Sequence, residues 1–214
     1  MNADVFWKII GEYNTHTAIP QIVFVCVLIF ALILSYNGKI QWSGKFVLGL
    51  VNLFISIVFF GIFGTQPIQK YFALPLYLCC GFLFLFESIK NRRDTLAKPN
   101  TARFILLVLI ALYPAISFAL GNRFPEMVTY IMPCPVISLS LAVYSGYRRK
   151  NIVLLLLLTL WGLTGIKSIF FKAYEDIILL VCGIYGVYLT YREIRNRYFS
   201  GKNTSDISKL IKNV

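Results

Sequence analysis

The chain has 214 residues, of which 58% are hydrophobic and only 14% are charged, and its formal net charge at pH 7 is +12. Soluble domains carry about a quarter charged residues, so this composition excludes an ordinary soluble protein. The apolar residues come in blocks of membrane length, which predicts an all-α integral membrane protein. Because the Lys and Arg residues lie between those blocks, we expect them to set the topology and to meet the lipid bilayer, and we expect no nucleic acid partner.

Residues 1–18 predict a short interfacial amphipathic helix that lies on the membrane surface before the first span. Apolar Phe6, Ile10 and Tyr13 share one face at helical spacing. Pro20 suits the opening turn of the helix that follows. The first apolar run ends without the cleavage site of a signal peptide, so we expect it to stay in the protein as the first span.

Seven apolar runs within residues 19–191 predict seven transmembrane helices, because each run has about the length needed to cross a ~30 Å hydrocarbon core. Pro133 and Pro135 interrupt the fifth run, so six spans with a re-entrant segment are the alternative architecture. Residues 192–214 are predicted to form a basic cytoplasmic tail. The expected spans are 19–36, 46–64, 72–89, 104–120, 128–147, 151–171 and 176–191.

The Lys and Arg residues are divided unevenly between the two sides of such a bundle. One side receives 16 of the 21, in the connections after the first, third and fifth spans and in the tail. The positive-inside rule therefore places the N-terminus outside and the C-terminus in the cytoplasm. In this orientation the unusual polar residues, including those of 121–135, lie at the outer ends of the spans, so we expect any site to face outward.

Motifs distributed along the chain carry a resemblance to a known family. They are Glu12-Tyr13-Asn14 with Ile19-Pro20-Gln21, Tyr113-Pro114, Gly121-Asn122-Arg123-Phe124-Pro125, Met132-Pro133-Cys134-Pro135, Trp161 with Gly162 and Gly165, and Glu175-Asp176. With them the chain resembles an uncharacterised group of bacterial multi-pass membrane proteins, catalogued as a domain of unknown function. The resemblance implies a place in the bacterial inner membrane and implies no activity. Relatives tend to have His in place of Asn122 and Thr in place of Val136, which argues against a metal or proton-relay role at position 122.

Pro133-Cys134-Pro135 predicts a broken helix, because each proline removes an amide donor and clashes with the preceding turn. Broken helices recur at the binding sites of transporters, where helix ends point at a solute or ion. The alternatives are a simple kink in which Cys134 packs, and a reactive thiolate. Met127, Met132 and Cys134 could also hold a soft metal ion. Their spacing matches no recognised metal motif and the chain has one His, so we predict neither a metal nor a cofactor.

The charged residues Lys167, Glu175 and Asp176 are predicted at one depth, near the outer headgroups, with Arg123 and Glu126 opposite them. Together these groups could bind a zwitterion or relay protons. In the alternative interpretation Lys167 extends to the headgroups, and the two acids stabilise the start of the last helix through its dipole.

Two further patterns concern packing. Glu87 precedes Lys90 by three residues, which predicts a local salt bridge on one helix face. Glycines three residues apart let helices approach closely in a membrane. Such pairs are Gly61/Gly64, Gly162/Gly165 and Gly183/Gly186.

The leading hypothesis is a transporter or binding protein, rather than an enzyme, whose outward-facing pocket at the broken fifth helix takes a small solute, ion or lipid. One alternative is a membrane enzyme acting on a lipid or quinone-like substrate, with Glu175 and Asp176 as acid and base and Arg123 holding a headgroup. Another is an accessory or structural subunit. The residues expected to bind the ligand are Tyr13, Asn14, Asn122, Arg123, Glu126, Cys134, Lys167, Glu175 and Asp176.

Overall fold

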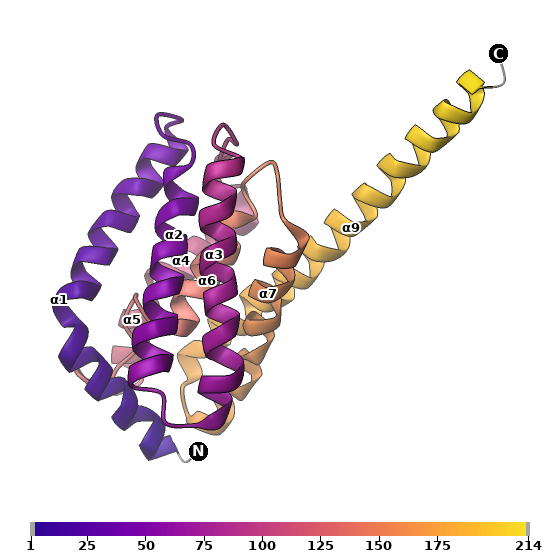
Figure 1. The fold of residues 1–214 in the computed structure, drawn as a ribbon. Coiled ribbons are helices and arrows are strands. Elements are labelled where there is room, and N and C mark those ends of the chain that lie inside the picture. The colour runs from indigo at the N-terminus through magenta and orange to yellow at the C-terminus, as the bar shows by residue number, and fades with distance from the viewer. Residues whose placement is uncertain (1–2, 213–214) are drawn as a thin grey trace.

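A computed structural model describes the backbone of residues 3–212 and the side chains of residues 4–198. In this part of the chain every regular element is a helix, and the helices form a bundle from which the end of α9 extends (Figure 1). The elements are α1 (Ala3–Tyr36), α2 (Ser43–Phe54), η1 (Ile55–Ile62), η2 (Gln69–Ala73), α3 (Leu74–Lys90), α4 (Thr101–Ala111), α5 (Tyr113–Ala119), α6 (Pro133–Tyr144), α7 (Ile152–Leu163), η3 (Thr164–Lys167), α8 (Ser168–Phe171), η4 (Tyr174–Asp176) and α9 (Ile177–Lys212). Residues 192–212 of the predicted tail thus continue the last helix.

Several helices have the length and composition of membrane spans, as the composition predicts. In the described residues five segments qualify, or six if the bent pair α4–α5 is counted as one span. At 12 residues, α6 is only about 18 Å long, so it is shorter than a hydrocarbon core of about 30 Å. Seven full crossings and their orientation therefore stay a prediction. The five qualifying segments are Asp4–Tyr36, Ser43–Ile62, Gln69–Lys90, Ile152–Phe171 and Tyr174–Tyr198.

The first helix differs from the predicted surface helix followed by a span. α1 is one helix from Ala3 to Tyr36, with Pro20 inside it rather than in an opening turn. The helix continues without a break past residue 18, and within it Tyr13 and Asn14 are fully buried against the rest of the bundle. Residues 3–18 are therefore the first half of the first span-length helix.

A proline bends the expected fourth span. α4 ends at Ala111 and α5 begins at Tyr113, and the two helices meet at 51°. Pro114 lies in the first turn of α5, where its ring and its missing amide hydrogen prevent a straight continuation of α4. The bend directs α5 toward the start of α9, which matters for the site described below.

One end of the bundle gathers the connections that are rich in Lys and Arg. Leu96 pairs with Tyr147 through the backbone, and the Tyr147 hydroxyl donates to the Gln41 carbonyl at 3.4 Å. We call this end the basic end; its connections are 37–42, 91–100 and 145–151. The opposite end, which we call the loop end, holds the connections 63–68, 120–132 and 172–173.

A buried ion pair at the basic end replaces the salt bridge predicted between Glu87 and Lys90. The Lys45 amine is fully buried and lies 3.5 Å from Glu87 and 2.6 Å from Asp94. Glu87 also accepts a hydrogen bond from the Asn91 side chain at 2.7 Å, whereas the Lys90 amine lies over the Phe86 ring. The local Glu87–Lys90 pair is not formed, because a buried amine must be matched by carboxylates.

The glycine pairs of the last helices do allow close packing. A Cβ atom added at Gly162 would lie 2.7 Å from the Cα atom of Gly183, and one added at Gly183 would lie 2.5 Å from the Gly162 carbonyl carbon. α7 and α9 therefore touch through their backbones at this point. A Cβ atom at Gly61 would meet only the Leu74 side chain at 3.6 Å and a carbonyl of its own helix, so the Gly61/Gly64 pair does not serve helix contact.

Candidate functional site

The connection between α5 and α6 is irregular and folds back onto α1. Gly121 has a φ angle of +101°, a left-handed conformation that glycine adopts without strain and that lets the chain leave α5. Arg123 and Glu126 then pair through the backbone and close a tight turn. Irregular backbone at membrane depth must have its carbonyl groups satisfied by protein or water.

Two α1 residues supply the hydrogen bonds that hold this connection. The Asn14 amide donates to the carbonyl oxygens of Pro125 at 2.7 Å and Met127 at 2.8 Å. The Tyr13 hydroxyl donates to the Ile131 carbonyl at 2.6 Å. Tyr13 and Asn14 are both 0% exposed. The two residues expected at the mouth of the pocket therefore act as buried anchors of the connection.

A polar network extends this anchor along α1. The Thr129 hydroxyl lies 2.7 Å from the Gln21 side-chain oxygen. The Gln21 amide donates to Asn14 at 3.1 Å and to Thr17 at 2.9 Å. Every polar side chain in this group has a partner, which holds the connection in one position.

The anchored connection leads directly into α6, whose start is the break in the fifth helix. Met132 is extended, and α6 begins at Pro133, where a missing amide hydrogen costs nothing because the first turn of a helix has no partner for it. The Tyr77 hydroxyl donates to the Pro133 carbonyl at 2.7 Å. Cys134 is thereby held in the first turn of α6, and the broken fifth helix predicted from Pro133 and Pro135 is present.

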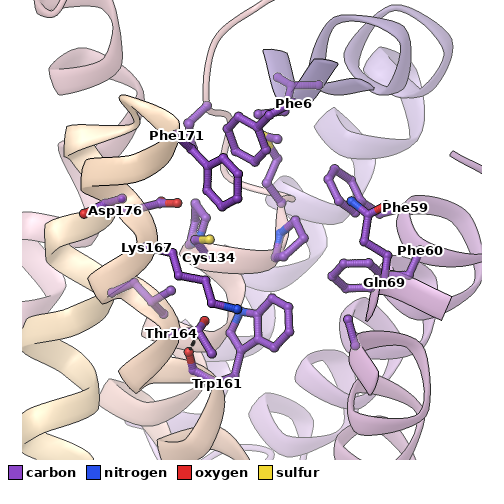
Figure 2. A pocket seen from close by; sticks show the side chains of 18 of the residues that line it. Phe6, Phe59, Phe60, Gln69, Cys134, Trp161, Thr164, Lys167, Phe171 and Asp176 are labelled. Atoms are coloured by element: carbon purple, nitrogen blue, oxygen red, sulfur yellow. Dashed lines mark hydrogen bonds between the residues drawn. The ribbon is translucent and has the colours of Figure 1, made fainter. Parts of the chain in front are cut away.

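A pocket of about 160 Å³ lies at the loop end beside this helix start (Figure 2). It reaches the surface, since exposed Ile68 and Lys167 contribute to its wall. Its polar lining comes from Gln69, Thr164, Ser168 and the groups described next. Its apolar walls include aromatic side chains, from Phe6 of α1, Phe59 and Phe60 of η1, Phe72 of η2, Trp161 of α7 and Phe171 of α8.

Two hydrogen-bond donors of the pocket have no acceptor among the residues that the structure describes. The indole N–H of Trp161 is enclosed without a partner among the described residues. The amine of Lys167 forms no salt bridge or hydrogen bond with any side chain of residues 4–198. In Figure 2 the Lys167 side chain extends into the pocket toward the Trp161 indole. The pocket therefore offers a cation and an N–H group to an acceptor from outside the chain.

The carboxyl group of Asp176 also lines the pocket. The Tyr113 hydroxyl donates to it at 2.9 Å, and the Cys134 thiol lies beside it. Asp176 is 8% exposed. The bend before α5 is what brings Tyr113 to this position.

Glu175 lies behind the pocket wall rather than in it. One of its oxygen atoms accepts hydrogen bonds from the Ser117 hydroxyl at 2.7 Å and from the Asn122 amide at 3.3 Å. Its other oxygen atom is buried with no partner among the described residues. Asn122 also donates to Ser117 at 3.1 Å, so it positions this group and does not reach the pocket.

The ion pair considered between Lys167 and the two acids is not formed. No Lys or Arg whose side chain is described makes a salt bridge with Glu175 or Asp176. Lys167 and Asp176 instead line the same pocket. A ligand in this pocket would meet both a cation and a carboxyl group.

Arg123 and Glu126 lie outside the pocket. The Arg123 guanidinium donates to the carbonyl oxygens of Phe118 at 2.8 Å and Asn122 at 3.0 Å, and it stacks on the Phe118 ring at 4.0 Å. Glu126 is exposed and packs near Gly11 of α1. Arg123 is therefore not placed to hold a headgroup at the acids, as the enzyme hypothesis required.

The structure divides the nine sequence-predicted residues by position. Cys134, Lys167 and Asp176 line the pocket. The residues behind or beside it are Tyr13, Asn14, Asn122 and Glu175, and those outside it are Arg123 and Glu126.

No group of three or more His, Cys, Asp or Glu residues that could hold a metal ion occurs in the described part of the chain. The three sulfur atoms considered for a soft metal are differently placed. Met132 and Cys134 line the pocket but Met127 does not, and the Met132 sulfur accepts the Thr129 amide hydrogen at 3.2 Å.

The aromatic walls and the partners of the acids were not predicted from the sequence. Ser117 carried a usable signal, because a polar residue inside an apolar run must find a partner in the bundle. Trp161 and Tyr113 belong to motifs of the resemblance but had no assigned role. The π-helical segments η1 and η2, which often mark functional sites, turn Phe59, Phe60 and Phe72 toward the pocket, and their sequences carry no recognisable signal for it.

Comparison with curated proteins and with solved structures finds no match. A family model does match, and it covers residues 3–200, which is nearly the whole chain. The family is described as one of unknown function, so it assigns no activity to the pocket. The chain belongs to the family of unknown function DUF6064.

Proposed function

We propose that this protein is a membrane carrier or binding protein for a small amphipathic solute with an anionic group, taken up in the loop-end pocket. The observation that carries the proposal is that the Trp161 indole N–H is enclosed without a partner among the described residues, in a pocket that the exposed Lys167 also lines. Buried donors are normally paired within the protein. Donors left free in a pocket are a recognised feature of ligand sites.

The size and lining of the pocket limit the solute. A volume of about 160 Å³ is close to the roughly 150 Å³ of a cavity that takes up benzene. The aromatic side chains around it favour a flat or short apolar body through ring contacts. A carboxylate on such a body would accept hydrogen bonds from Lys167 and Trp161.

The broken helix supports carriage as well as binding. In transporters, solute sites are built where helices are interrupted and their ends face the solute. Here the start of α6 at Pro133 borders the pocket, and α6 is too short to cross the bilayer alone. In the orientation given by the positive-inside rule, the pocket faces outward.

A binding measurement with benzoate tests the proposal. A Trp7→Phe/Trp42→Phe protein leaves Trp161 as its one tryptophan, so its fluorescence reports the pocket. We expect benzoate to quench this fluorescence saturably, and benzylamine, with the same ring and the opposite charge, to bind more weakly. Lys167→Gln should weaken benzoate binding about tenfold, since it removes a charge-assisted hydrogen bond.

Lys172 provides the matched control, because it is exposed at the same end and does not line the pocket. Lys172→Gln should leave benzoate binding within about twofold. Proteoliposomes should then show benzoate uptake that Lys167→Gln slows. Absence of saturable quenching, or equal effects of the two Lys substitutions, would overturn the proposed solute class; binding without uptake would restrict the function to binding.

A further inference from the structure

A second hollow, at the basic end, is lined by an unusual number of cations. It has a volume of about 650 Å³ and lies between the end of α3 and the connection from α6 to α7. We call it the basic pocket. Its charged lining consists of Lys90, Arg92, Arg93, Arg148, Arg149 and one acid, Asp94.

The acid does not neutralise these cations. The Asp94 carboxylate is bound to the buried Lys45 amine at 2.6 Å and accepts the Arg149 amide hydrogen at 3.2 Å. Five cationic side chains thus share one hollow without a carboxylate of their own. Like charges that line one pocket repel one another, and an anion bound among them offsets that repulsion.

Two of the arginines have no partner among residues 4–198. Arg149 donates to Asn91, and Arg92 stacks on Trp42. Arg93 and Arg148, by contrast, make no hydrogen bond or salt bridge with the described side chains and backbone. Each guanidinium offers five N–H donors in a planar fork that fits the oxygen atoms of a phosphate. Their chemistry points to a phosphate group rather than to a small halide.

The helix that ends at the basic pocket, α3, and the helix that follows its other border, α7, both carry exposed apolar side chains. On α3, the side chains of Phe82, Phe86 and Ile89 are 61%, 51% and 77% exposed, and their spacing puts them on one helix face. On α7, Val153 and Leu156 are also exposed, and α7 contacts α3. A soluble phosphate would make no use of these faces, whereas acyl chains would cover them.

We infer that the basic pocket binds the phosphate group of an anionic phospholipid, with its acyl chains along the exposed faces of α3 and α7. Basic pockets between helices are typical binding sites for such headgroups. The site lies at the end of the bundle opposite to the solute pocket, so it does not depend on the proposed function.

Lipid binding by the full chain in dodecyl maltoside, followed by native mass spectrometry, tests this inference. Titration with phosphatidylglycerol should show saturable binding of the lipid to the protein. Phosphatidylcholine should bind more weakly. Arg93→Gln/Arg148→Gln should weaken phosphatidylglycerol binding about 25-fold, from roughly fivefold for each cation near a lipid phosphate. Because neither side chain has a partner among the described residues, the thermal unfolding midpoint without added lipid should not fall.

A control with the same loss of charge uses Lys39→Gln/Lys98→Gln, since both lysines are exposed at the basic end and outside the pocket. This variant should bind phosphatidylglycerol within about twofold of the parent protein. Equal weakening in the two double variants would mean diffuse charge attraction and would overturn the site. Sodium phosphate provides the other comparison: if millimolar phosphate displaces phosphatidylglycerol completely, the site is for a free phosphate and the lipid assignment is wrong.

Discussion

The Lys45 amine and the Asp94 carboxylate, 49 residues apart in the chain, form an ion pair of 2.6 Å whose side chains are 0% and 2% exposed. The pair joins α2 to the connection after α3, and the Arg149 amide bound to Asp94 adds the connection after α6. The amine also lies 4.4 Å from the centre of the Tyr147 ring. Three segments of the basic end are therefore held by one buried cation.

Asp94→Asn is expected to destabilise the protein by about 3–5 kcal/mol, because it leaves a buried amine with only the more distant carboxylate of Glu87. The unfolding free energy in detergent, from titration with sodium dodecyl sulfate, measures the effect. Glu193→Gln is the control, since it removes the exposed pair with Arg197 and should cost about 1 kcal/mol or less. If both substitutions lower the unfolding free energy equally, the buried pair stabilises the protein no more than the exposed pair does.

Tyr13→Phe removes one hydroxyl group and keeps the ring. The Ile131 carbonyl then loses the donor at 2.6 Å that holds the irregular connection, at a cost of about 1–3 kcal/mol. Proteolysis within residues 120–132 should become faster, which limited digestion in detergent measures. Tyr188→Phe, at an exposed position on α9, should leave the digestion rate unchanged; a parallel increase there would contradict the anchoring role of Tyr13.

Gly183→Ala is expected to separate α7 from α9. Its methyl group would overlap the Gly162 backbone at 2.5 Å, and relief of that overlap costs about 1–3 kcal/mol. Gly61→Ala meets no such obstacle and should change the unfolding free energy by about 0.5 kcal/mol or less. Thermal unfolding of both variants measures the difference, and a tolerated Gly183→Ala would mean that the two helices can move apart freely.

Thiol labelling can locate Cys134 in the pocket. In a Cys26→Ser/Cys79→Ser background, the cysteines left are buried Cys80 and Cys182 and the partly exposed Cys134. Methyl methanethiosulfonate should modify Cys134 first, and benzoate should slow that reaction by occupying the pocket. Mass spectrometry of digested protein identifies the modified residue. Faster labelling of Cys182 would contradict the described burial.

The sequence predicts the kind of protein and the broken start of α6 because both depend on local properties. Apolar run length marks the helices, and Pro133 with Pro135 prevents a regular helix whatever surrounds them. The continuity of α1 through Asn14 was missed, because it depends on hydrogen bonds to Pro125 and Met127, more than 100 residues later. The spacing of apolar residues within 1–18 indicated a separate surface helix instead.

Which of the predicted residues line the pocket also depends on contacts between segments far apart in the chain. Lys167 and Asp176 could be placed at one depth by counting residues along their helices, and they do line one pocket. Arg123 could be placed at that depth too, but the turn that points it toward Phe118 is set by its pairing with Glu126. Depth in a bundle can be counted from a sequence, whereas the direction of a side chain around the bundle cannot.

The hydrogen bonds from α1 to the irregular connection have a consequence for folding during synthesis. Asn14 and Tyr13 bind partners 111 to 118 residues later, which at 5–20 residues per second are synthesised roughly 6–24 s after α1. Until then the Asn14 amide has no partner in that connection, and the loop end cannot close. α1 therefore lacks these contacts until the connection has been synthesised, and the loop-end pocket is among the last parts to form. A ribosome-arrested chain ending before residue 121 should accordingly expose a cysteine placed at position 14 to aqueous thiol reagents, and the completed chain should protect it.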